Sequence, residues 1–188
     1  MLIVKKLSDN SKDYLNTYYE IIDQMKNDMQ NVEICNSISK VYIEQIIPHK
    51  KAAIALSENI LRYTTNVDIE NLAKNIISEH SNEIEKLENI LETCMRVCNS
   101  ERDVNLYMRR FNEILNNMLN RLNNISTTNN LNALYLNALI AHHEGGISLA
   151  QNALSYTLCP ELKTLANEMI VKYTAQLVIF RQLLRNLG

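Results

Sequence analysis

The sequence contains very few residues that interrupt helices. Its 188 residues include only three glycines, two prolines and no tryptophan. Because glycine and proline mark turns and breaks in secondary structure, their scarcity argues against a fold rich in turns. Together with the abundance of Leu, Ile, Glu and Lys, it favours an all-helical protein.

Several further features are missing, and each absence excludes a class of protein. The formal net charge of −2 gives no electrostatic reason to expect nucleic-acid binding. No apolar run approaches the ~18 residues of a membrane-spanning helix. The stretch 1–6 has the wrong order for a signal peptide, because its apolar residues precede its charges. We therefore expect a cytoplasmic protein. Since no long linker is present, we expect residues 1–188 to form a single compact domain.

The four cysteines do not form a recognisable framework. Cys94 and Cys98 stand four residues apart, a spacing that is awkward for a disulfide within one helix and unlike a CxxC metal knuckle. Cys35 and Cys159 are isolated in the sequence. The favoured interpretation is reduced, mostly buried thiols. A soft-metal role for Cys94 and Cys98 is the alternative.

The chain contains a long internal repeat. The segment 47–56, IPHKKAAIAL, returns as 140–149, IAHHEGGISL, at an offset of 93 residues. The alignment continues without a gap from 14–91 to 107–184. A repeat of this length is a structural unit. We expect repeats at about 9–95 and 102–188, which share one core and are related by a pseudo-two-fold axis.

Each half has the apolar periodicity of three amphipathic helices. The predicted fold is an all-α bundle of six helices, built from two three-helix repeats. The second and third helices of both halves should form a four-helix core, with the first helices packed onto it. The predicted ranges are 11–31, 37–64, 67–95, 102–124, 130–157 and 160–187.

Unusual residues in the second helix of each half suggest a close helix crossing. Pro48 lies inside a predicted helix, where it removes a backbone donor. Gly145 and Gly146 replace Ala52 and Ala53 and cost roughly 1 kcal/mol each in helix propensity. Close approach of the two second helices would offset this cost. We therefore expect Gly146→Leu to be destabilising, and Gly146→Ala to be neutral or stabilising.

The histidines are the best candidates for a functional site. His49 and His142 are the only ones that the repeat preserves, so both should lie near the axis, close enough for one bridging water or ion. His80 and Glu83 stand three apart on the third helix, a usable spacing for metal ligands. The candidate metal ligands are His49, His142, His143, His80, Glu83 and Glu144.

A structural role for the histidines is the competing interpretation. Buried and uncharged, His49 and His142 would be satisfied by hydrogen bonds, with the preserved Tyr42 and Tyr135 as natural partners. Catalysis has the least support. A di-iron site needs Glu-x-x-His on two helices, and this sequence contains none. We therefore expect a non-enzymatic protein.

The repeated segments resemble a known family. Residues 46–57, IIPHKKAAIALS, and 139–150, LIAHHEGGISLA, are similar to the signature MIPHHQxAIxMA of the domain-of-unknown-function family 305. The resemblance implies a ferritin-like helical bundle, and copper binding is attributed to some family members. This chain departs from the signature at Lys50, which replaces its second histidine, and at Leu56 and Leu149, which replace its final methionine.

Two functional hypotheses follow. The first is a metal-binding protein that holds a copper or zinc ion through histidines near the axis. The second is a structural or protein-interaction module that forms a homo-oligomer.

Overall fold

The computed structural model describes residues 6–187, which form six α-helices and no β-strand. The predicted all-α fold is confirmed, and every predicted helix is present. The bounds are α1 (Asp9–Gln30), α2 (Ile38–Leu61), α3 (Val67–Cys94), α4 (Glu101–Asn123), α5 (Leu131–Leu154) and α6 (Pro160–Asn186).

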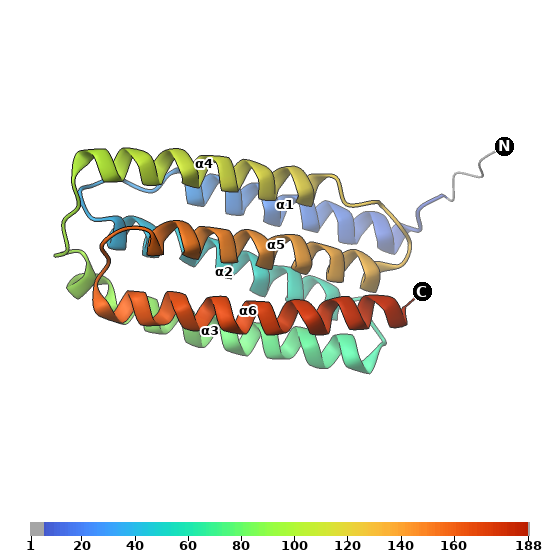
Figure 1. The fold of residues 1–188 in the computed structure, drawn as a ribbon. Helices are drawn as coiled ribbons and strands as arrows, with labels where there is room; N and C mark the ends of the chain where they lie inside the picture. Colours follow the sequence, from blue (N-terminus) through green and yellow to red (C-terminus); the bar gives the residue numbers. More distant parts are fainter. Residues whose placement is uncertain (1–5, 188) are drawn as a thin grey trace.

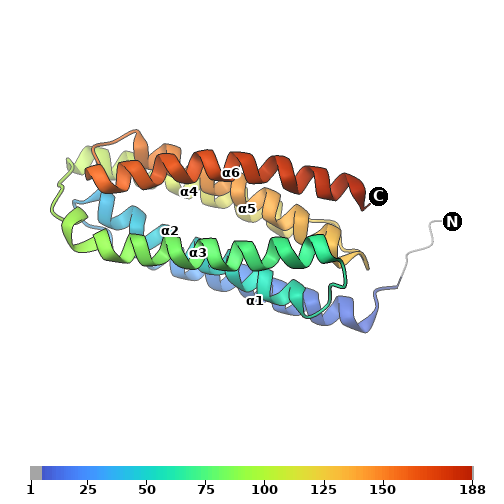
Figure 2. The same cartoon turned by 90° about the horizontal axis from the view of Figure 1, so that it is seen from below.

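The helices are stacked as three layers of two. Figure 1 shows the pair α1 and α4, the pair α2 and α5, and the pair α3 and α6, one below another. The same pairs remain side by side in the perpendicular view of Figure 2, and the helices of each pair are in contact. The middle pair, α2 and α5, therefore packs against all four outer helices.

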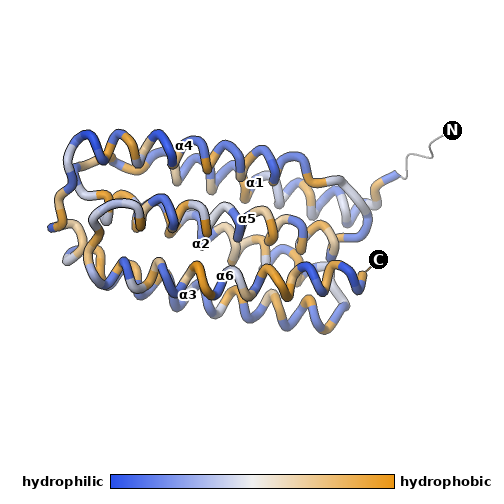
Figure 3. The backbone as a smooth tube through the Cα atoms, viewed as in Figure 1, coloured by the Kyte–Doolittle hydropathy of each residue, from blue (hydrophilic) through white to orange (hydrophobic). Residues whose placement is uncertain are grey.

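Burial follows from this layering. The outer helices alternate between hydrophilic and hydrophobic residues along their length (Figure 3), as expected for helices with one buried face. In contrast, α2 and α5 bury most of their residues, including polar ones, and leave only one stripe that includes Lys51 and Gln151 exposed. Polar groups on α2 and α5 therefore need partners inside the protein. Over residues 6–187, no helix is long and apolar enough to cross a membrane.

Equivalent contacts recur in the two halves. The Asn59 side chain donates a hydrogen bond to the backbone oxygen of Tyr14, and Asn152 donates to that of Tyr107, each at 3.1 Å. Edge-to-face contacts of Tyr14 with Tyr63 and of Tyr107 with Tyr156 recur in the same way. All these pairs differ by 93 residues. The contacts support the predicted internal repeat, while the pseudo-two-fold superposition remains a prediction.

The prediction of reduced, mostly buried thiols is wrong. Cys94, at the end of α3, forms a disulfide with Cys159, the residue that precedes α6, across 65 residues of sequence. Cys35 and Cys98 are free thiols, and Cys98 is exposed outside α3. Sequence spacing could not predict the pair, because the packing of α3 beside α6 brings the two residues together. The signal-peptide prediction rests on residues 1–6, and residues 1–5 lie outside the part of the chain that the structure describes. Residue 188, the last of the second repeat, also lies outside it.

Candidate metal centre

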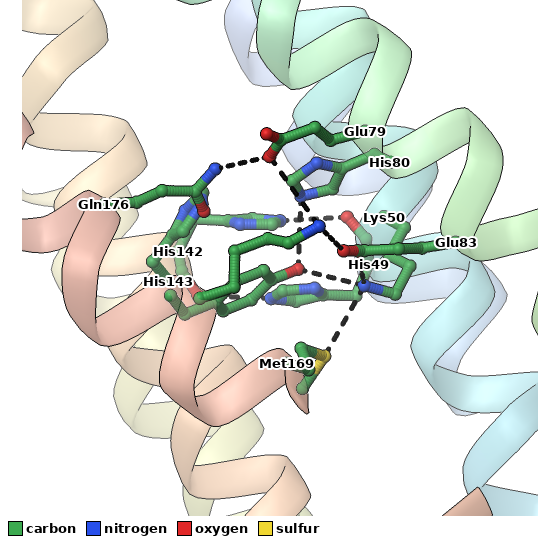
Figure 4. A network of polar contacts seen from close by, with 11 residues as sticks. His49, Lys50, Glu79, His80, Glu83, His142, His143, Met169 and Gln176 are labelled. Atoms are coloured by element: carbon green, nitrogen blue, oxygen red, sulfur yellow. Dashed lines mark hydrogen bonds and ion pairs between the residues drawn. The ribbon is translucent and has the colours of Figure 1, made fainter. Parts of the chain in front are cut away.

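All four histidines of the chain lie together in the buried centre. His49 and His142 come from the middle layer, where His143 follows His142, and His80 reaches them from α3 (Figure 4). Each of these side chains has 0% solvent exposure. The predicted grouping of histidines near the centre is therefore present in the fold.

His49 and His142 are in direct contact and are held by each other's backbone. Their rings stack with centroids 3.6 Å apart. The His49 Nε2–H donates to the backbone oxygen of His142 at 3.1 Å, and the His142 Nε2–H donates to that of His49 at 2.9 Å. A carbonyl oxygen only accepts, so both rings carry their proton on Nε2. Stacking at this distance leaves no room for an ion between the ring faces.

Tyr42 and Tyr135 do not form the predicted hydrogen bonds with His49 and His142. Tyr135 shares a hydrogen bond with Ser57 at 2.7 Å, and the buried Tyr42 hydroxyl has no hydrogen-bond partner among the described residues. The Nδ1 atoms of His49 and His142 are also without partners in the part of the chain that the structure describes. The reciprocal backbone bonds, which no sequence pattern indicates, replace the tyrosines.

Gly146 makes the close approach possible. A Cβ added there would lie 2.7 Å from Cε2 of Tyr173 and 2.9 Å from Cε1 of His49. Gly145 faces a different helix, because its Cβ would overlap Met118 of α4. The two glycines therefore serve two interfaces. Ala52 and Ala53, which the glycines replace in the second half, are buried in α2. Pro48 does not end α2, which continues through it as one helix.

We expect Gly146→Ala to lower the free energy of unfolding by about 1 kcal/mol, contrary to the expectation from helix propensity alone. Overpacking costs about 1–3 kcal/mol, while the propensity gain returns only about 1 kcal/mol. Denaturant unfolding measures the change. Gly145→Ala should also lower stability, because the added Cβ would lie 2.7 Å from Cγ and 3.1 Å from Cβ of Met118. Equal or higher stability of Gly146→Ala would contradict the close approach.

The two candidate glutamates lie in ion pairs. Glu144 pairs with Arg121 and Arg181 at the surface, away from the histidine cluster. Glu83 accepts from Lys50 and from Lys172, each at 2.6 Å. Burial alone would raise the pKa of Glu83, but the two ammonium groups outweigh it and the pKa is lowered. Neither glutamate places a carboxylate oxygen close enough to the histidine nitrogens to form a group of three metal ligands.

The histidines are uncharged at neutral pH. Burial lowers the pKa of His142 to about 4, and it lowers those of His49, His80 and His143 well below the usual value, with neighbouring imidazoles and Lys50 acting in the same direction. Neutral imidazoles are the form that binds metals. The cluster therefore holds metal-ligand atoms without competition from protons.

His143 lies in a chain of contacts that lacks one proton. Its Nδ1–H donates to the backbone oxygen of Leu139 at 3.0 Å, so the neutral ring has a lone pair on Nε2. That lone pair faces Oε1 of Gln176, also an acceptor, at 3.2 Å. The amide nitrogen of Gln176 is used on the Glu79 carboxylate, at 2.8 Å. Reversing the amide would place its oxygen against the partly exposed carboxylate of Glu79, which is also an acceptor.

Of the three contacts, His143 with Leu139, His143 with Gln176 and Gln176 with Glu79, only the first and the last therefore contain a proton. Two facing lone pairs are unfavourable in a buried site, and a cation between them removes the repulsion. The imidazole nitrogen, amide oxygen and nearby carboxylate are all atoms that bind metal ions. Sequence reasoning included His143 but missed Gln176 and Glu79. The signal that could have found Gln176 is its position 93 residues after Glu83.

One other group of donor atoms converges. Among residues 6–187, the only three His, Cys or carboxylate donors within 4.8 Å of one another are Cys94, Cys159 and Glu161. The two sulfurs are joined in the disulfide, so they are not available as thiolates. The alternative of a soft-metal role for Cys94 and Cys98 is also wrong, because Cys94 is held in the disulfide.

The chain resembles solved structures of copper-bound and silver-bound bundles. A structure titled "CopM in the Cu(II)-bound form" matches with a TM-score of 0.60 and 20% identity, over 80% of this chain and 97% of that one. "CopM in the Ag-bound form (by soaking)" matches with a TM-score of 0.59 and 21% identity, over 79% and 95%. At these identities the likeness shows the shared fold. No curated protein matches the chain.

A family model matches the sequence twice. The matches cover residues 22–91 and 40–184, which include both histidine segments and most of the chain. The resemblance noted at IPHKKAAIAL and IAHHEGGISL is therefore confirmed. The protein belongs to the family described as domain of unknown function (DUF305).

Proposed function

We propose that this protein binds a divalent transition metal ion, Cu(II) or Zn(II), in its buried centre, with His143 Nε2 as the anchoring ligand. The observation that carries the proposal is the missing proton between His143 and Gln176. A metal ion takes the place of that proton and binds both facing atoms. Glu79 supplies negative charge beside them.

The donor chemistry fits this class of ion. Imidazole suits copper and zinc, and copper forms the strongest complexes of the divalent first-row metals. The alternative cation, a proton on His143, is opposed by full burial and by the nearby Lys50 ammonium. The DUF305 membership and the likeness to CopM in metal-bound forms are consistent with the proposal.

Calorimetric titration with Cu(II) tests the proposal. The apo protein should carry Cys35→Ser and Cys98→Ser, because the two free thiols would reduce copper or bind it. We expect one tight site per chain, which His143→Leu abolishes and Gln176→Leu weakens. His142→Gln is the matched control, because it removes an equally buried imidazole whose Nε2 is already bonded to a backbone oxygen.

The same titration distinguishes the structural alternative. The reciprocal bonds between His49 and His142 join α2 to α5 and need no ion, which fits a purely structural cluster in an interaction module. Equal, weak Cu(II) binding by the parent protein and by His143→Leu would favour that module, including a homo-oligomer, over metal binding.

A further inference from the structure

Lys50 occupies in the first half the position that His143 occupies in the second. The two residues are 93 apart, as are Glu83 and Gln176. The contact between them is also equivalent: Lys50 bonds to Glu83, 33 residues later, and His143 contacts Gln176, 33 residues later. The bundle therefore holds two related sites, one with an imidazole and an amide, the other with an ammonium and a carboxylate.

A carboxylate, a tyrosine hydroxyl and a thioether surround the Lys50 ammonium. Its Nζ donates to Oε2 of Glu83 at 2.6 Å and to the hydroxyl of Tyr173 at 3.2 Å, and it lies 3.5 Å from Sδ of Met169. The Tyr173 hydroxyl also shares a hydrogen bond with Nε2 of His80 at 3.1 Å. Figure 4 shows Lys50 between Glu83 and Met169. Only 2% of Lys50 is exposed, so these contacts replace its hydration.

One member of this set, the Met169 sulfur, is better suited to a metal ion than to an ammonium group. A thioether sulfur is a weak hydrogen-bond acceptor, so Met169 does little for a lysine. A thioether and a carboxylate both bind metal ions, the thioether favouring copper in its Cu(I) state, and the Tyr173 hydroxyl adds a neutral oxygen beside them. A pocket of about 60 Å³, lined in part by Lys50, Glu83, Met169 and Lys172, gives access to this point.

We propose that Glu83, Tyr173 and Met169 form a second cation site of the metal-binding type, which the chain fills with the ammonium group of its own Lys50. The tethered cation excludes a metal ion from this half. Removing the lysine opens the site to a divalent transition metal ion. That the unmodified chain binds one ion rests on the function proposed above, whereas the existence of the second site does not.

The test is Lys50→His in the Cys35→Ser, Cys98→Ser background, titrated with Cu(II). The variant should bind one more equivalent per chain than its parent, and the added Glu83→Gln change should remove only that equivalent. Lys51→His is the matched control, because it adds a histidine at the neighbouring exposed position, away from the three donors.

Each outcome decides the question. If parent and Lys50→His differ by one equivalent, the second site exists, even when the parent binds nothing and the proposed function fails. If they bind the same number, the inference is wrong, even when the parent binds one ion. If the variant is unfolded without metal, recovery of helicity on adding Cu(II) supports the site, and continued lack of helicity overturns it.

Discussion

Replacing Glu83 by alanine is expected to lower the free energy of unfolding by about 3–5 kcal/mol, because it leaves the Lys50 ammonium buried without a counter-charge. The side chains of Lys50 and Glu83 are only 3% and 16% exposed, so the ammonium is largely shielded from water when its partner is removed. Burial already lowers the pKa of Lys50, and the Glu83 carboxylate opposes that effect. Denaturant unfolding at neutral pH measures the loss.

Two variants separate charge compensation from general disruption of α3. Glu79→Ala, one turn earlier, should cost under about 1 kcal/mol, since its side chain is 40% exposed and its ion pair with Lys172 is long, at 3.9 Å, so water can replace it beside Lys172 and Gln176. Adding Lys50→Met to Glu83→Ala should restore most of the stability, because no unpaired charge remains buried. A double variant as unstable as Glu83→Ala would show that the ion pair is not the cause.

Acidification from pH 7 to pH 4 is expected to cost several kcal/mol of stability. The folded protein keeps its four histidines neutral, while the unfolded chain titrates near the usual pKa of about 6.5. Below pH 6.5 the unfolded state therefore binds more protons, and stability falls as the pH falls. For His142, whose folded pKa is about 4, the loss alone is about 3 kcal/mol by pH 4.

The pH range from 6.5 to 5 isolates the contribution of the histidines. The chain has no histidine outside the cluster, so a change in stability between pH 6.5 and 5 reports on these four side chains. The carboxylate of Glu83 loses its contribution only below that window, because its pKa is lowered from 4.5. Unfolding midpoints should be measured with a chelator present. Constant stability between pH 7 and 5 would contradict neutral, buried imidazoles.

The helices were predictable because their signals are local. Apolar residues at three- and four-residue spacing predict all six elements, and the Asn66 side chain caps α3 by accepting from the backbone N–H groups of Asp68 and Ile69. The repeat also predicted that His49 and His142 meet, since equivalent residues of two helices beside an axis come together. Helix ends differ from the predicted ones by up to about three residues, where the last turns give way to loops.

The partners of the site residues were not predictable in the same way. Contacts between α3 and α6, such as Tyr173 with His80, depend on the rotation of two long helices that no local pattern fixes. The position of protons on His143 follows from a backbone oxygen and from Gln176, which only tertiary packing supplies. In the sequence, Lys50 only replaces a histidine of the family signature. In the structure, its ammonium contacts Glu83, Tyr173 and Met169.

The nitrogen NMR spectrum of the imidazoles tests the central claim most directly. In the apo protein at pH 7, His143 should be protonated on Nδ1 only, and His49 and His142 on Nε2 only. Adding one equivalent of Zn(II) should shift the Nε2 resonance of His143 and leave those of His49 and His142 in place. A His143 ring that carries protons on both nitrogens, or that does not respond to Zn(II), would contradict a metal ion at this position.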